Sequence, residues 1–281
     1  MSCAVKHSFV LFSLCCLMLG CDGNNMRSTG KMELSTIEDV QASAWAELKE
    51  KKIYFGHQSV GNNIIDGIKD WGRQKPQVKL RIISLQDSYK LNSPGLYQAN
   101  IGKNEDPRSK INAFVADMRQ GIGNSADIAF FKFCFVDITA KTNIEEVFNH
   151  YSKTMEKLQD KYPKVTFVHF TVPLLRRNKP TFKSYIKKLI AKGDGFFDDS
   201  HNIARSKYNQ LLREKYMGKE PLFDLAMVES TYQDGSRCTF SANGHTYYAL
   251  VPEYTKDGGH LNELGQKVAA EQLLIFLAGL I

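Results

Sequence analysis

Two segments at opposite ends of the chain carry side chains that could perform nucleophilic chemistry together. Near the C-terminus, Asp257 and His260 are separated by two glycines and precede a predicted helix. A carboxylate at this spacing can accept a hydrogen bond from one imidazole nitrogen, which leaves the other nitrogen free to take a proton. Ser59 follows a short apolar run, at a point where a strand gives way to a helix. The sequence therefore predicts a relay of Ser59, His260 and Asp257.

Simpler interpretations exist for each residue alone. Serine is a favoured N-cap, and glycines such as Gly56 are common in turns between strands and helices. Gly56 also stands three residues before Ser59, so the segment differs from the Gly-x-Ser-x-Gly nucleophile elbow. A lone His260 could cap or pack at the start of a helix. The accompanying Asp257, the two glycines and the following Leu-Asn-x-x-Gly favour the catalytic interpretation.

Apolar runs alternate with helical patterns along most of the chain. Four runs without alternation, typical of strands buried on both faces of a parallel sheet, occupy residues 52–55, 80–84, 127–133 and 165–170. Helical patterns occupy residues 35–50, 60–71, 107–119, 143–160, 180–215 and 261–277. This order predicts a three-layer α/β/α sandwich with a mostly parallel sheet of about five strands. Ligands of such sheets bind beyond the carboxyl ends of the strands.

The N-terminus is predicted to lie outside this fold. Lys6 precedes an apolar stretch, residues 9–19, that is too short to span a bilayer. It ends in Met18-Leu19-Gly20-Cys21, which resembles a bacterial lipobox whose cysteine is lipidated; a signal peptide without lipid is the alternative. We expect a signal peptide at 1–20, a lipid-anchored tether at 21–34 and a single domain at 35–281. The mature protein would be an exported lipoprotein of the cell envelope, periplasmic or at the cell surface.

Composition argues against several other function classes. The chain has 281 residues, of which 43% are hydrophobic, enough to bury a sizeable core. The formal net charge of +7 is spread without a basic block, so nucleic-acid binding is not expected. No CxxC or HExxH spacing appears, and we expect neither a metal nor another cofactor. Cys134 and Cys238 could form a disulfide or stay as thiols.

The segment from Asp257 to Gly265 resembles the last block of the SGNH/GDSL hydrolases, Asp-x-x-His-Leu-Asn-x-x-Gly. In that family the Asp and His also lie three residues apart near the C-terminus, and the serine follows the first strand. The resemblance covers about residues 50–280 and implies a flavodoxin-like fold. It also implies a serine esterase in which Ser59 attacks an ester, His260 acts as base and then acid, and Asp257 orients His260.

The other family blocks are less well matched. The first reads His57-Gln58-Ser59-Val60 in place of Gly-Asp-Ser-Leu, and His57 could line the pocket. Gly102 is the counterpart of the glycine whose N–H binds the oxyanion. The third block, Gly-x-Asn-Asp, reads Cys134-Phe135-Val136-Asp137 and lacks the asparagine that also binds the oxyanion. We expect a substitute donor, with Asn104 as first candidate and Lys132 as second.

The resemblance and the export signal together predict an ester substrate, such as an O-acyl group on an envelope or extracellular carbohydrate. An acyltransferase using the same triad is an alternative, since it would pass the acyl group to a sugar hydroxyl. A non-catalytic lipoprotein that binds a carbohydrate or a partner is another. The missing asparagine favours this last alternative, whereas retention of Ser59, Asp257 and His260 argues against it. Membrane contact is expected through the lipid only.

Overall fold

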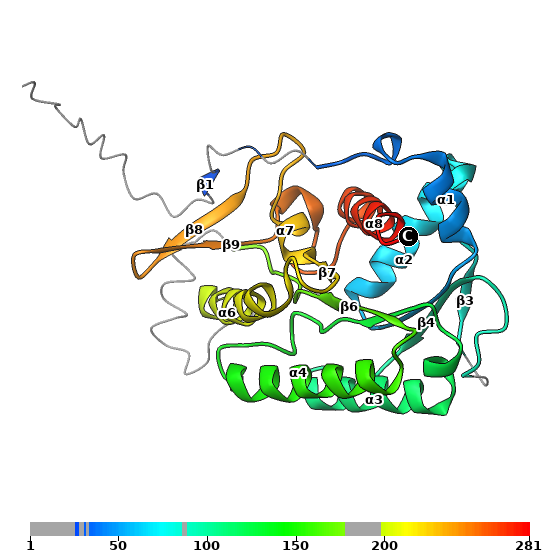
Figure 1. The fold of residues 1–281 in the computed structure, drawn as a ribbon. Coiled ribbons are helices and arrows are strands. Elements are labelled where there is room, and N and C mark those ends of the chain that lie inside the picture. Colours follow the sequence, from blue (N-terminus) through cyan, green and yellow to red (C-terminus); the bar gives the residue numbers. More distant parts are fainter. Residues whose placement is uncertain (1–25, 28–30, 32–33, 86–88, 178–197) are drawn as a thin grey trace, which may run out of the picture.

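A six-stranded parallel sheet forms the centre of the fold (Figure 1). The computed structural model describes residues 26–27, 31, 34–85, 89–177 and 198–281. The strands of this sheet are β2 (Lys52–His57), β3 (Ile82–Ser84), β4 (Gly95–Asn100), β5 (Ile128–Phe131), β6 (Thr166–Phe170) and β7 (Leu222–Phe223). Their order is β3-β4-β2-β5-β6-β7. The predicted parallel sheet is confirmed, with six strands instead of about five.

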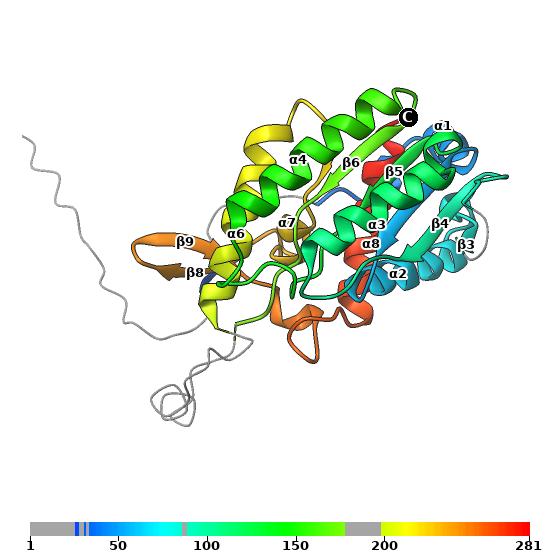
Figure 2. The ribbon, with the colours of Figure 1, turned by 90° about the horizontal axis from the view of Figure 1, so that it is seen from below.

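Helices cover both faces of the sheet, which confirms the three-layer α/β/α sandwich (Figures 1 and 2). One face packs against α1 (Ala42–Lys49), α2 (Val60–Gln74), α7 (Leu225–Glu229) and α8 (Glu263–Ala278). The other packs against α3 (Pro107–Gln120), α4 (Ile144–Lys161) and α6 (Asp199–Tyr216). Each face of the sheet therefore has its own hydrophobic core.

Side chains alternate between these two cores along the central strands, as the pleat of a sheet requires. In β2, Ile53 and Phe55 belong to the core under α2 and α8, whereas Tyr54 stacks on α3. Phe55, Phe130 and Phe170 stand on three successive strands, with neighbouring ring centroids 4.8 and 5.0 Å apart. This row of rings packs β2, β5 and β6 together just below the ends from which functional loops emerge.

The order in which successive strands are added to the sheet changes side at β2. β3 and β4 lie on one side of β2, whereas β5, β6 and β7 lie on the other. The helix after β2 covers one face, and the helices after β4 and β5 cover the opposite face. Open α/β sheets bind ligands at such a switch point, beyond the carboxyl ends of the strands. The segments 58–59, 101–106 and 132–137 all begin at this edge.

Several elements differ from the sequence-based expectations. β4 was not predicted, because Gly95-Leu96-Tyr97-Gln98-Ala99-Asn100 lacks a continuous apolar run. The segment 225–256, which has little regular pattern, contains α7 and a hairpin of β8 (Cys238–Ala242) and β9 (His245–Tyr248). Of the helical pattern at 180–215, the later part belongs to α6, and residues 178–197 lie outside the described residues.

The expectations for the N-terminus fall mostly outside the described part of the chain. This applies to the signal peptide at 1–20 and to Cys21. Within the predicted tether, β1 (Met26–Arg27) pairs antiparallel with β8, so its backbone lies against the domain. Among the described helices, none combines the length and the apolar character that a membrane span requires.

Helices α2 and α8, which flank the two halves of the predicted relay, pack unusually closely at Gly67. A Cβ at this position would lie 2.3 Å from the backbone oxygen of Gln266 and 2.7 Å from the Cβ of Ala270. We expect Gly67→Ala to destabilise the fold by about 1 kcal/mol or more, measured by urea unfolding. Overpacking costs roughly 1–3 kcal/mol and exceeds the gain in helix propensity of up to about 1 kcal/mol.

Gly279→Ala is the matched control for this substitution. It also adds a methyl group near α8, but its Cβ would meet Phe276 O at an ordinary 3.5 Å. The control should stay within roughly 0.5 kcal/mol of the parent protein. Equal unfolding free energies for the two variants would contradict the close packing of α2 on α8.

Candidate active site

Ser59 stands at the N-terminus of α2, directly beyond the carboxyl end of β2. Its backbone has φ 52° and ψ −109°, a conformation that non-glycine residues rarely adopt and that costs energy to maintain. The hydroxyl makes no capping hydrogen bond to any described residue of the helix. The interpretation of Ser59 as an ordinary N-cap is therefore wrong, because its side chain points elsewhere.

The hydroxyl of Ser59 instead contacts the imidazole of His260. The distance between Ser59 Oγ and His260 Nε2 is 2.6 Å, although the two residues are 201 positions apart in the sequence. On the other side of the ring, His260 Nδ1 lies 2.6 Å from Asp257 Oδ2. An ionised carboxylate can only accept, so Nδ1 carries the proton and Nε2 of the neutral ring is free to accept from Ser59. The structure thus brings the three predicted side chains into one hydrogen-bonded series.

The carboxylate of Asp257 holds both the ring and the backbone of the segment. Its Oδ1 accepts hydrogen bonds from the N–H groups of Gly259 at 2.9 Å and His260 at 2.8 Å. Partial burial raises the pKa of Asp257, but the bonds from Gly259 N–H, the His260 ring and His260 N–H outweigh it. The pKa of Asp257 falls to about 2 as a result. The carboxylate is therefore charged at neutral pH.

The two glycines of this segment meet different needs. Gly258 has φ 97°, which a residue with a side chain adopts only under strain. Gly259 lies against the rings and side chains of its neighbours, and a Cβ there would come within 2.8 Å of both Phe135 and Leu175. The ring of Phe135 also packs edge-on against His260, with centroids 5.5 Å apart. The two glycines therefore allow the imidazole of His260 to pack against the ring of Phe135.

Two further side chains fix the histidine segment, and the sequence reasoning missed both. Asn63 lies one turn after Ser59 on α2, and its Oδ1 accepts from the N–H of Leu261 at 3.1 Å. Thr255 Oγ1 accepts from the N–H of Gly258 at 2.9 Å. Asn63 ties the segment to the helix that carries Ser59. Its place one helical turn after the predicted nucleophile was the only available sequence signal.

Gly102 lies in the loop that follows β4, next to the nucleophile segment. The side chain of Gln58 connects the two, because its Nε2 donates to the carbonyls of Ile101 at 2.9 Å and Gly102 at 2.6 Å. Gly102 has φ 59°, and a Cβ there would lie 2.6 Å from the backbone nitrogen of Lys110. Within the described residues, the N–H groups of Ser59 and Gly102 have no hydrogen-bond acceptor. Both are available to an incoming oxygen atom.

Asn104 lies on the exposed part of the same loop and is not hydrogen-bonded to Ser59 or His260. Its Oδ1 accepts from Lys110 Nζ at 3.0 Å. Lys110 is fully buried and also donates to Asp137 Oδ2 at 2.5 Å, while Asp137 Oδ1 accepts from Glu105 N–H at 2.9 Å. This buried ion pair fixes the loop after β4. A role for Asn104 as an oxyanion donor stays a prediction.

His57 and Lys132 do not occupy the positions expected of groups that contact substrate. His57 is 0% exposed, and its ring packs on Phe55 and under Gly61, where a Cβ would lie 2.4 Å from the imidazole. Burial, together with the charge of Lys132, lowers the pKa of His57 to about 3. Lys132 is itself buried, with Nζ 3.3 Å from the carbonyl of Phe133. Both side chains belong to the interior beneath the site, so His57 does not line a pocket open to solvent.

The third block, residues 134–137, forms a turn beyond β5. Val136 stands where the family has asparagine and offers no side-chain donor. Asp137 N–H donates to Cys134 O at 3.0 Å, which closes the turn, and Cys134 Sγ lies 3.7 Å from Gln58 O. Cys134 and Cys238, whose pairing the sequence left open, are both buried thiols.

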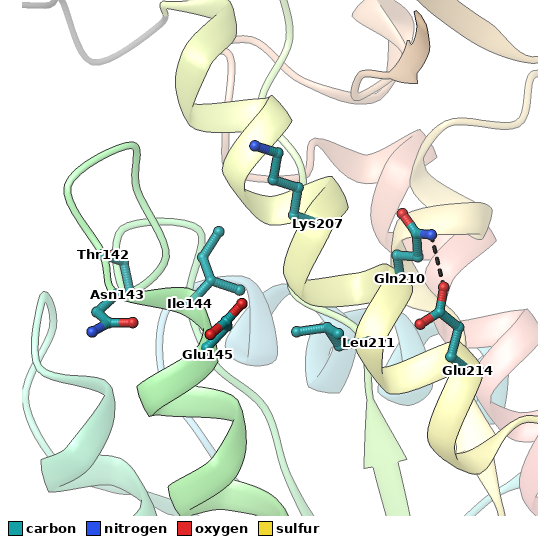
Figure 3. Close-up of a pocket in the computed structure, with 8 residues that line it drawn as sticks. All are labelled: Thr142, Asn143, Ile144, Glu145, Lys207, Gln210, Leu211 and Glu214. Carbon is teal, nitrogen blue, oxygen red and sulfur yellow. Dashed lines mark hydrogen bonds between the residues drawn. The ribbon is translucent and has the colours of Figure 1, made fainter.

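A separate hollow of about 450 Å³ lies between the N-terminal turn of α4 and one face of α6 (Figure 3). The residues that line it include the charged Glu145, Lys207 and Glu214, and Gln210 donates to Glu214 at 2.7 Å. It shares no residue with the site around Ser59.

Several solved structures are similar to this chain over most of its length. A protein described as a GDSL-like lipase from Parabacteroides merdae has 12% identity and a TM-score of 0.48, covering 83% of this chain and 97% of its own. A protein described as a platelet activating factor from Streptococcus pneumonia has 14% identity and a TM-score of 0.44, covering 86% and 94%. The periplasmic domain of a lipopolysaccharide acetyltransferase from Salmonella ser. Paratyphi A has 14% identity and a TM-score of 0.43, covering 83% and 88%.

No protein-family model matches the sequence. No curated protein matches it either. The function of this chain is therefore inferred from the geometry of its own site.

The hydrogen bonds at Asp257 predict a specific titration. A ¹³C NMR titration of the Asp257 carboxyl should give a pKa of about 2, because its partners favour the charged form. His260→Ala removes the ring that donates to Oδ2 and should move this pKa upward. Since the folded-state pKa lies below the unfolded value of about 3.8, the stabilisation is complete above pH about 4 and is lost as pH falls through 2. A midpoint near 4 in the parent protein would contradict the described contacts.

Proposed function

We propose that this chain is a divergent SGNH/GDSL hydrolase that acts as a serine esterase. The observation that carries the proposal is the hydrogen-bonded series from Ser59 through His260 to Asp257, with both distances at 2.6 Å. A serine hydroxyl is a poor nucleophile until an adjacent base accepts its proton. In this series Nε2 of His260 is that base, and Asp257 stabilises the imidazolium that forms.

The reaction would proceed through an acyl-enzyme. Ser59 Oγ attacks the ester carbonyl carbon while its proton passes to His260 Nε2, which gives a tetrahedral oxyanion. The oxyanion collapses, the bond to the alcohol oxygen breaks, and His260 returns the proton to the departing alcohol. Water then attacks the acyl group on Ser59 with His260 again as base, which releases a carboxylic acid and restores the serine.

The available backbone N–H groups support the same reaction. Charge develops on the former carbonyl oxygen, and fixed donors there stabilise the transition state more than the ground state. The N–H groups of Ser59 and Gly102 are the candidates, because Gln58 holds their two segments side by side. The positive end of the α2 dipole adds to this field at Ser59.

The exposure of the catalytic side chains favours a substrate whose ester group is attached to a large, hydrated molecule. The side chains of His260 and Asp257 are 50% and 58% exposed. A buried tunnel would suit a long acyl chain, whereas an open triad can reach an acyl group that projects from a polymer surface. We therefore propose O-acylated carbohydrate of the cell envelope or its surroundings as the substrate class.

Labelling with a fluorophosphonate probe tests the nucleophile directly. The parent protein should form a covalent adduct at Ser59, and Ser59→Ala should not. Ser241→Ala is the control, because Ser241 is an exposed serine in β8, outside the site, and its loss should leave labelling unchanged. Hydrolysis of an aryl acetate should fall about 10²–10⁴-fold in His260→Ala, as expected for loss of a general base.

Other outcomes of the labelling and hydrolysis experiments would favour a different function. An unlabelled parent protein without esterase activity would leave a binding lipoprotein as the better description. Labelling with little hydrolysis, accompanied by acyl transfer to an added glycan, would identify a transferase that uses the same three residues. Equal labelling of Ser59→Ala and parent protein would contradict the proposal outright.

We also propose that the protein is exported and anchored by lipid at Cys21. The support comes from the sequence, in which an apolar stretch of signal-peptide length ends at Gly20-Cys21. In a bacterial host, the parent protein should incorporate labelled fatty acid and sediment with membranes, whereas Cys21→Ser should incorporate none. The control Cys134→Ser retains the lipidation site and should remain labelled. Equal incorporation by Cys21→Ser and the parent protein would contradict this anchor.

A further inference from the structure

The turn at residues 134–137 lies against the two segments that carry the predicted nucleophile and base. Cys134 Sγ lies 3.7 Å from the carbonyl of Gln58, the residue before Ser59. The ring of Phe135 packs against the imidazole of His260 at 5.5 Å. The turn is also tightly held, since Cys134 N–H donates to Asp137 Oδ2 at 2.6 Å. A donor on this turn would therefore stand near both the nucleophile and the base.

A buried arginine binds the backbone at the centre of this turn from the interior of the protein. Arg205 on α6 is 1% exposed, and its Nε donates to the carbonyl of Phe135 at 2.8 Å. Its Nη1 donates to Asn202 Oδ1 at 2.9 Å, and Asn202 is itself bonded to both backbone groups of Leu175, at 2.7 and 3.0 Å. Burial lowers the pKa of Arg205 to about 9, an effect that the neighbouring carboxyl of Glu229 partly offsets. Burying a guanidinium is costly, and the hydrogen bonds to Phe135 and Asn202 offset part of that cost.

The hydrogen bond from Arg205 to the Phe135 carbonyl determines where the next backbone N–H points. In a trans peptide the C=O and N–H of one unit point in opposite directions, and no peptide bond among the described residues is cis. The carbonyl of Phe135 points into the interior toward Arg205, so the N–H of Val136 points away from it. Within the described residues this N–H has no hydrogen-bond acceptor, although Val136 is a half-buried residue. Most backbone N–H groups of enclosed turns have a partner, so this N–H group is available to a ligand.

We propose that the backbone N–H of Val136, oriented by Arg205, donates to the oxyanion in place of the missing asparagine amide. This inference rests on the proposed esterase function and deepens it. The N–H groups of Ser59, Gly102 and Val136 then form the oxyanion site, one from each loop at the switch point. Arg205 is a positioning residue, since it acts through the peptide that it holds.

Replacing Val136 by the corresponding α-hydroxy acid tests the donor itself. This change converts the N–H into an ester oxygen and leaves every side chain intact. Loss of one oxyanion donor should lower kcat for an aryl acetate by about 10²–10³-fold. KM should change little, because the donor acts mainly in the transition state. The analogue should also discriminate less between an oxygen ester and its thionoester, whose sulfur is a weak acceptor.

Arg205→Lys tests the positioning role. Lysine keeps a positive charge near Glu229 but lacks the planar donors that hold the Phe135 carbonyl. The expected result is a fall in kcat of about 10²-fold, as for a misplaced catalytic group, with the same loss of discrimination against the thionoester. Asn209→Leu is the matched control on the same helix. Asn209 is equally buried, but its two hydrogen bonds, at 2.7 and 2.9 Å, hold Val172 in another loop.

The control should melt at a lower temperature and keep both kcat and the preference for oxygen over sulfur. If the α-hydroxy analogue keeps parental kcat, or if Asn209→Leu loses as much discrimination as Arg205→Lys, the inference is overturned. Failure of the esterase proposal looks different, because the unmodified protein would then neither react with a fluorophosphonate nor hydrolyse the ester.

Discussion

One hydrogen bond joins the beginning of the domain to its end, between Ser59 Oγ and His260 Nε2. Neither residue can bring this contact about locally. β2 delivers the serine to the edge of the sheet, and the packing of α2 on α8 fixes the histidine segment beside it. The close approach at Gly67 and the bond from Leu261 N–H to Asn63 connect the same two helices. Sheet order and helix packing therefore act together to set a distance that must be correct to within about 0.5 Å.

The sequence allowed the fold class and the three relay residues to be predicted, because their signals are local. Buried parallel strands are apolar runs, and a carboxylate with an imidazole three residues later needs only one short segment. β4 escaped detection because its place in the sheet depends on β2 and β3, and its own residues are partly polar. The hairpin of β8 and β9 was missed for a related reason. Its alternation is short, and its partner β1 lies more than 200 residues earlier.

Roles that depend on distant contacts could not be predicted in this way. His57 stands two residues before the serine, yet the alternation of β2 turns its ring into the core, where burial lowers its pKa to about 3. Arg205 is 70 residues from the carbonyl that it binds, and nothing in its neighbourhood on α6 marks it. Lys110 and Asp137 form an ion pair across 27 residues. A sequence read alone gives the type of such residues but not the direction in which they face.

The buried polar side chains around the site have a common cause. Loops at the carboxyl edge leave the regular ladder of the sheet, so their N–H and C=O groups need other partners when they are enclosed. Asp137, Asn202 and Arg205 supply these partners to the turn after β5 and to the loop after β6. Charged groups in the interior are a costly way to hold a loop, because a desolvated charge must be matched by good geometry. Each of these buried side chains is stable only while the backbone group that it binds stays in place. For this reason the same side chains hold their peptide groups in fixed orientations.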